Sequence, residues 1–103
     1  MKEQYEGKYV IVRGDRSGVY AGTLLDRDGA EVLLGDVRNL WYWDGAASVL
    51  QLAETGPTNP EECKFTMTVQ SLLLTDVIEI IPATEQAETV IKGVAEWKRE
   101  MNF

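Results

Sequence analysis

The sequence of 103 residues predicts a single α+β domain over residues 1–103, with a mostly antiparallel sheet of about five strands and two helices that cover it. Two observations predict this class. The first part of the chain carries β-branched and aromatic segments separated by glycine-containing turns, and two later segments repeat apolar residues with the period of a helix. The expected order of elements is β-β-β-α-β-β-α.

Three strands are expected before residue 44. The segments are Lys8 to Arg13, Val19 to Asp26, and about Ala30 to Trp43. The pair Asp28-Gly29 favours a tight hairpin turn with a positive φ angle. Gly35 lies inside the third and longest strand, where an isolated glycine indicates a bulge or a bend. We expect these consecutive strands to pair in antiparallel fashion.

A helix is expected from Asp44 to Thr55, because apolar residues recur there at i, i+3, i+4 and i+7. Asp44 is its expected N-cap, and Gly56-Pro57 is expected to end it. Alternation of apolar and polar residues then predicts a fourth strand over residues 64–69. A fifth strand is expected from Thr75 to Ile81.

The last helix is expected to begin at an N-cap, Thr84. Its apolar stripe runs as far as Met101, with Lys98 and Arg99 near the C-terminus, where cations suit the helix dipole. Gly93 lies in the interior of this helix, where glycine costs about 1 kcal/mol relative to alanine. Close packing of Gly93 against another backbone is the expected reason.

Composition excludes several classes of function. The net charge of -7 opposes binding to duplex nucleic acid or to an anionic membrane. There is no histidine, the commonest general base and zinc ligand, and the one cysteine, Cys63, lacks a clear thiolate-stabilising environment. No leader or membrane-spanning run is apparent. We therefore expect a cytoplasmic, non-catalytic protein with no cofactor and no specific metal site, which forms a homo-oligomer because so small a core gains from association.

The segment 37–48 is the most unusual, because it contains three large aromatic residues in a row. In a strand, Trp41 and Trp43 share the face of Val37, and we expect both indoles in the core or in a subunit interface. Arg38 and Tyr42 share the opposite face.

Arg38 and Tyr42 together form a candidate ligand site. A guanidinium group holds a phosphate bidentately, and a tyrosine ring offers a surface on which a base stacks. An ion pair between Arg38 and a surface acid such as Asp36 is the alternative, with equal weight.

Two further segments have groups that bind anions. Residues Gly45 to Ser48 open the expected helix with small residues, which leaves backbone N–H groups and the serine hydroxyl free, although a capping Asp44 would occupy the same donors. The loop from Arg13 to Gly18 combines Arg13 and Arg16 with two glycines. It lacks the lysine of a phosphate-binding loop, and a solvated hairpin loop is the favoured alternative.

Several strings resemble a family of small bacteriophage and prophage proteins. They are Gly18 to Leu24, Arg38 to Ser48, Cys63 to Phe65 and Thr75 to Ile80, and the resemblance spans roughly Lys8 to Thr84. Many members of that family have no assigned role. Others resemble the Thoeris anti-defence sponges, which bind immune signals of the cyclic ADP-ribose type without cleaving them.

The resemblance implies a symmetric homo-oligomer with pockets near its subunit interfaces. Members often carry a second arginine where this sequence has Asn39, and this difference argues against a double-arginine grip on phosphate. The candidate ligand-binding residues are Arg38, Tyr42, Trp43, Gly45, Ala46, Ser48, Arg13 and Arg16, together with Lys98 and Arg99 on charge and position alone.

We therefore expect a non-catalytic anti-defence sponge that sequesters a small cyclic nucleotide, of the cyclic ADP-ribose or cyclic oligonucleotide type, in the cytoplasm of an infected bacterium. Sequestration requires no base, nucleophile or metal. Two alternatives stay open. One is a protein-interaction module that inhibits a host protein, and the other is a minor phage structural subunit.

Overall fold

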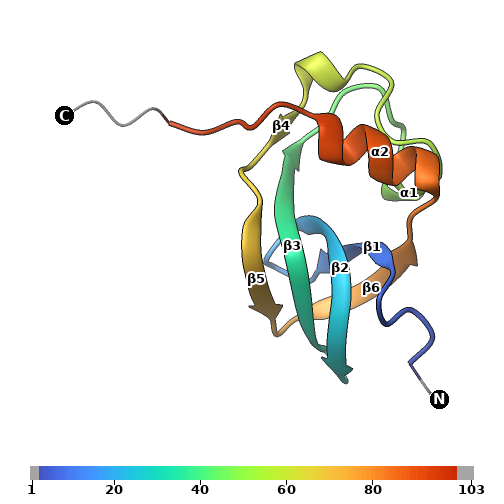
Figure 1. Cartoon of the computed structure of the whole chain (residues 1–103), viewed down its shortest axis with the longest axis vertical. Coiled ribbons are helices and arrows are strands. Elements are labelled where there is room, and N and C mark those ends of the chain that lie inside the picture. Colours follow the sequence, from blue (N-terminus) through green and yellow to red (C-terminus); the bar gives the residue numbers. More distant parts are fainter. Residues whose placement is uncertain (1–2, 100–103) are drawn as a thin grey trace.

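The computed structural model describes residues 3–99 and combines one antiparallel sheet with two helices (Figure 1). The predicted α+β class is confirmed, with six strands in the described part instead of about five. The order along the sheet is β4-β3-β2-β1-β6, and β5 also pairs with β3. The elements are β1 (Tyr9–Gly14), β2 (Val19–Asp28), β3 (Glu31–Tyr42), α1 (Val49–Glu54), the 3-10 helix η1 (Pro60–Glu62), β4 (Lys64–Phe65), β5 (Val69–Leu74), β6 (Val77–Pro82) and α2 (Glu85–Gly93).

The sheet curls into a partly open barrel. β5 and β6 pair with different strands, β3 and β1, yet only residues 75–76 connect them. The Val77 amide donates to the carbonyl of Ala30, and the Asp15 amide donates to the carbonyl of Asp76, which fixes this junction to two neighbouring loops. In Figure 1, β1 and β6 accordingly run across β2 and β3.

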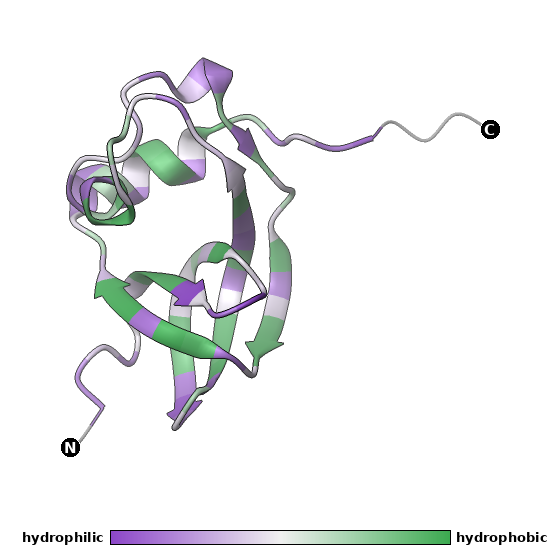
Figure 2. Cartoon of the chain, turned by 180° about the vertical axis from the view of Figure 1, so that it is seen from behind, coloured by the Kyte–Doolittle hydropathy of each residue, from purple (hydrophilic) through white to green (hydrophobic). Residues whose placement is uncertain are grey.

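Apolar side chains form two cores, one on each side of the sheet. The barrel cluster lies inside the curl and contains strand residues: Val10, Val12, Leu24, Val32, Leu34, Val37, Leu74 and Val77. The helix-side cluster lies between the sheet and the helices: Tyr9, Ile11, Ala21, Leu40, Leu52, Ala53, Phe65, Ala87, Ile91 and Val94. β1 contributes to both clusters, which explains its uninterrupted apolar run, and Figure 2 shows hydrophobic residues recurring along the strands. No helix within residues 3–99 is long and apolar enough to cross a membrane.

Tyr9 makes the helix-side cluster sensitive to alkaline pH. Burial raises the pKa of Tyr9 to about 12, whereas a tyrosine in an unfolded chain ionises near pH 10. Between these two values the unfolded state holds fewer protons than the folded state, so the free energy of unfolding falls as pH rises. We expect a Tyr9→Phe variant to lose less stability over this interval than the parent, as measured by urea unfolding at about pH 8 and about pH 11. Equal losses in the two proteins would contradict the assignment.

α1 begins later than its sequence pattern predicts. Ser48 is the N-cap, and its hydroxyl accepts a hydrogen bond from the Gln51 amide at 3.2 Å. Asp44 is not the cap, because its side chain instead accepts a bond from the Asn59 amide group at 3.1 Å. The predicted end at Gly56 is confirmed, and Gly56 has a φ angle of 73°.

α2 begins as predicted and ends early. The Thr84 hydroxyl accepts from the Ala87 amide at 3.1 Å and donates to the Glu54 carbonyl at 2.6 Å, which joins the two helices. The helix ends at Gly93, so Lys98 and Arg99 lie in the segment that follows it, and Met101 lies outside the described residues.

The expected close packing at Gly93 is wrong. A Cβ atom there would meet nothing within 4 Å, and Gly93 is the last residue of α2 instead of an interior one. The chain leaves the helix at this point because the next residues extend along β4, where Glu96 forms a parallel bridge with Phe65.

The predicted strand over residues 64–69 is divided between β4 and β5. Thr66 lies at the break, where its hydroxyl accepts from the Asn39 amide and its own amide donates to the Asn39 carbonyl. The irregularity expected near Gly35 is present, because the β2–β3 register shifts there and Asp36 has a φ angle of 45°.

Candidate functional site

Arg38 is a structural arginine, and its predicted place on an open ligand-binding face is wrong. Its exposed fraction is 4%, and its guanidinium donates four hydrogen bonds of 2.9–3.2 Å to backbone carbonyls, out of five N–H donors. The acceptors are the carbonyls of Phe65, Thr66, Ile91 and Val94. These partners, and not Asp36, neutralise the cost of burial, so Arg38 has little capacity left for a phosphate.

The loop between β1 and β2 does bind an anion, but the anion is the chain's own carboxylate. The amides of Arg16 and Ser17 donate to one oxygen of Asp76 at 2.8 and 2.9 Å, and the Ser17 hydroxyl donates to the other at 2.7 Å. These hydrogen bonds, that of the Arg16 amide first, lower the pKa of Asp76. The Arg13 side chain forms an ion pair with Glu79. The loop therefore closes the barrel, and the backbone amides of Arg16 and Ser17 are occupied by Asp76.

The turn before α1 is also occupied internally. The Gly45 carbonyl accepts bonds from the Thr58 amide and hydroxyl, both at 3.0 Å. The Ala47 amide donates to the Gln51 side chain at 2.8 Å, and the Ser48 hydroxyl caps Gln51. Ala46 is half-buried against the helix-side cluster. The Ala47 amide and the Ser48 hydroxyl, two of the groups expected to face an anion, are thus bonded to Gln51.

Trp41 lies on the surface of the chain, so a place in the core is wrong for it, whereas a place in a subunit interface stays a prediction. The side chain is 61% exposed, whereas Trp43 packs against the helix-side cluster as expected. Two irregularities of β3 contribute: after Asp36, which has a positive φ angle, Arg38 and Leu40 lie on the buried helix side, and the β3–β4 register shifts between Leu40 and Tyr42. By alternation along the strand, Trp41 then points away from the helices.

The exposed indole of Trp41 is part of a cluster of three side chains. Trp41 and Trp97 stack with ring centroids 4.8 Å apart and an interplanar angle of 28°. The ammonium of Lys64 lies 5.8 Å from the Trp41 ring centroid and 5.7 Å from that of Trp97. We call these residues the aromatic cluster. Tyr42, also about half exposed, is the cross-strand partner of Lys64.

The aromatic cluster is held in place by three segments that lie far apart in the sequence. Trp41 belongs to β3 and Lys64 to β4, while Trp97 follows α2. The Trp97 amide donates to the Phe65 carbonyl at 2.8 Å, so the last described segment lies alongside β4. The Arg38 guanidinium also fixes this segment, because it donates a hydrogen bond to the Val94 carbonyl. Arg38 is therefore a positioning residue for the cluster.

Sequence reasoning missed all three members of the aromatic cluster as site residues, because Trp41 was expected in the core or in a subunit interface. Trp97 fell on the apolar stripe of the expected helix, and Lys64 on the polar side of a strand. Lys98 follows Trp97 in the sequence, but its side chain forms an ion pair with Glu96 at 3.2 Å. Arg99 is exposed in the same segment.

The aromatic cluster offers two kinds of contact to a ligand. Exposed indole faces stack on planar rings, and an ammonium group attracts an anion. Lys64 is exposed, and it stands on a molecule whose net charge is -7, so it is a local positive centre on an acidic surface.

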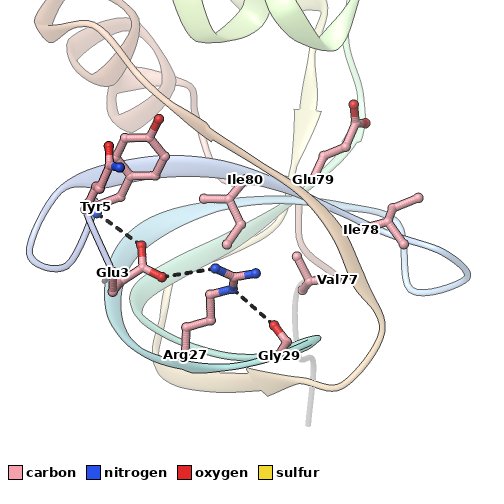
Figure 3. A pocket seen from close by; sticks show the side chains of 9 residues that line it. Glu3, Tyr5, Arg27, Gly29, Val77, Ile78, Glu79 and Ile80 are labelled. Atoms are coloured by element: carbon pink, nitrogen blue, oxygen red, sulfur yellow. Dashed lines mark hydrogen bonds and ion pairs between the residues drawn. The ribbon is translucent and has the colours of Figure 1, made fainter. Parts of the chain in front are cut away.

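The hollow beside β6 has a different character (Figure 3). Its volume is about 310 Å³, and its lining includes Glu3, Arg27 and Glu79. The Arg27 side chain donates to the Gly29 carbonyl at 3.1 Å and pairs with Glu3 at 3.4 Å. Because its carboxylates outnumber its arginine, this hollow does not favour a phosphate.

The described residues carry little catalytic chemistry. Burial raises the pKa of the Cys63 thiol, which keeps the thiol protonated at neutral pH. Within residues 3–99, no group of three or more cysteine or carboxylate side chains is placed to hold a metal ion.

Comparison with known proteins identifies a family without an assigned activity. A search of curated proteins finds no match. A family model matches residues 7–91, which include all of the described strands and most of α2, although not Trp97. The chain belongs to the family described as domain of unknown function DUF6948.

Proposed function

We propose that this protein is a non-catalytic binding protein that sequesters a small nucleotide through the aromatic cluster. The observation that carries the proposal is the stacked pair Trp41 and Trp97 with the ammonium of Lys64 against both rings. The outer faces of the indoles would stack on a base, and Lys64 would meet a phosphate.

The specific ligand that we propose is a cyclic nucleotide immune signal of the cyclic ADP-ribose or cyclic oligonucleotide type, bound in the cytoplasm of an infected bacterium. Sequestration needs affinity and copies but no reaction, in keeping with a chain that has no histidine and a thiol with a raised pKa. Arg38 is replaced by Lys64 as the cation in this proposal, because the guanidinium of Arg38 is bonded to carbonyls.

Calorimetric titration with cyclic ADP-ribose, cyclic di-AMP and ADP tests the proposal. We expect at least one of these ligands to bind, to quench tryptophan fluorescence, and to be recovered intact after heat denaturation. Trp41→Ala is expected to weaken that binding about tenfold or more, because stacking on one base contributes about 1–3 kcal/mol. Binding of no phosphate-bearing ligand, or recovery of a cleaved product, would contradict the proposal.

A matched pair of lysine variants tests the charge. Lys64→Gln is expected to weaken binding and to reduce its dependence on salt concentration, because one phosphate contact is lost. Lys8→Gln makes the same change in charge at an exposed position before β1, which is separated from β4 by β2 and β3. Equal effects of the two variants would point to the overall charge of the molecule and against a contact at Lys64.

A second candidate function is a protein-interaction module that acts through the same surface. One observation favours it: tryptophan and tyrosine are enriched in binding hot spots and methionine in protein interfaces, and Trp41, Tyr42 and Met67 are all exposed. A host protein whose binding is abolished by Trp41→Ala, in a chain that binds no nucleotide, would replace the first candidate with this one.

A further inference from the structure

One edge of β5 is unpaired. β5 pairs with β3 through a regular ladder from Val37↔Val69 to Val32↔Leu74. Within residues 3–99, no backbone hydrogen bond joins its other edge to another segment. Alternate residues of such an edge direct their N–H and C=O groups outward, where they can pair with another strand. Figure 1 shows β5 at the margin of the sheet.

This edge also lacks the features that protect edge strands from association. The sequence of β5, Val-Gln-Ser-Leu-Leu-Leu, contains no charged residue and no proline. The strand at the other margin of the barrel is β6. It carries Glu79, ends at Pro82 and lies beside residues 3–5. Charge, proline and a covering segment are the usual means of blocking an edge. β5 is therefore the edge that is open to a partner.

The side chains of β5 are self-complementary about Ser71. Val69, Ser71 and Leu73 alternate onto one face, and Val69 and Leu73 are 42% and 55% exposed. Leu72 and Leu74 point the other way and pack with the barrel cluster. An antiparallel copy of β5 centred on Ser71 places Val69 opposite the partner's Leu73. Ser71 then lies opposite the partner's Ser71, on the twofold axis.

We propose that two copies of this chain dimerise through β5, in an antiparallel ladder with its twofold axis at Ser71. A second copy fits this edge because the apolar–serine–apolar pattern pairs with its own reverse, and because a slip of one residue would oppose outward and inward side chains. Each molecule has a net charge of -7, so two copies repel each other. Contact through β5, which has no charged side chain, keeps acidic side chains of this strand out of the interface. Dimerisation is independent of the proposed ligand.

Sedimentation velocity over a range of protein concentrations tests the dimer. We expect a monomer–dimer equilibrium that shifts toward dimer as salt screens the repulsion between acidic copies. Ser71→Lys places two ammonium groups opposite each other and is expected to raise the dissociation constant about tenfold or more. Ile78→Lys makes the same change in charge on the exposed surface of β6 and is expected to leave the dimer intact. A monomer at every concentration, or a dimer broken only by Ile78→Lys, would overturn the proposal.

A disulfide experiment locates the axis directly. In a Cys63→Ala background, Ser71→Cys is expected to form a covalent dimer rapidly on mild oxidation, because Cα atoms of directly opposed residues lie about 4.5–5.5 Å apart, within the range of a disulfide. Ile78→Cys in the same background is the control for random collision. Equal rates of cross-linking for the two variants would overturn the register, and circular dichroism confirms that each variant is folded.

Discussion

Arg38→Met is expected to destabilise the protein by about 3–5 kcal/mol, because the change removes four hydrogen bonds from a charged donor to backbone carbonyls. The carbonyls of Phe65 and Ile91 keep a second donor, the amides of Trp97 and Val94, whereas those of Thr66 and Val94 lose the guanidinium that pairs with them. A domain of this size has a total stability of about 5–15 kcal/mol, so the variant loses a large part of it. Two of the carbonyls belong to Ile91 and Val94, at the end of α2, and the others belong to the β4 region. Urea unfolding followed by circular dichroism measures the loss.

Two comparisons separate burial from charge in this prediction. Arg38→Lys keeps the charge but cannot match the planar fork of the guanidinium, and we expect an intermediate loss. Arg13→Met removes an arginine from an exposed ion pair with Glu79, where we expect a loss below about 1 kcal/mol. If Arg38→Met and Arg13→Met cost the same, the carbonyl contacts of Arg38 are not the source of its effect.

The same variant connects stability to the candidate site. Arg38 holds the segment that carries Trp97, so we expect the stacking of Trp97 on Trp41 to weaken along with the fold. Near-ultraviolet circular dichroism reports on this stacking. A loss of nucleotide binding in Arg38→Met would then result from the displaced Trp97 ring and not from a lost contact between Arg38 and the nucleotide.

The regular part of the fold could be predicted from the sequence because its signals are local. Runs of β-branched and aromatic residues predicted β1 and β2 with ends within two residues, glycine turns predicted the hairpins, and Thr84 and Gly56 marked one end of each helix. The end of α2 could not be predicted, since apolar residues continue with helical spacing beyond Gly93. Contacts with β4 and Arg38 end the helix, and they join residues that are far apart in the sequence.

The candidate site was harder to predict, because two irregularities in β3, at Asp36 and between Leu40 and Tyr42, decide which side chains face out. Asp36 adopts a φ angle of 45° and shifts the alternation of β3, which buries Arg38 and exposes Trp41. A period-2 argument assigns these two residues to the opposite environments. Gly35 indicated that an irregularity exists, but not on which residue it falls or which way it turns the strand.

Gly45→Ala is expected to destabilise the protein by about 2–4 kcal/mol, since the new Cβ meets both an unfavourable backbone angle and fixed neighbours. The φ angle of Gly45 is 91°, and a Cβ there would lie 2.6 Å from the Asn59 amide nitrogen and 2.3 Å from the Thr58 hydroxyl. Thermal and urea unfolding measure the loss.

Gly7→Ala isolates the contribution of the backbone angle, because Gly7 has a φ angle of 84° and a Cβ there would meet nothing within 4 Å. We expect it to cost about 1–2 kcal/mol, less than Gly45→Ala. Removing the Thr58 hydroxyl in a Gly45→Ala, Thr58→Ala double variant is not expected to restore stability, because the backbone nitrogens of Thr58 and Asn59 remain within 2.7 Å of the new atom. Full rescue by the double variant would instead show that the turn moves freely, and Gly45 would then be replaceable.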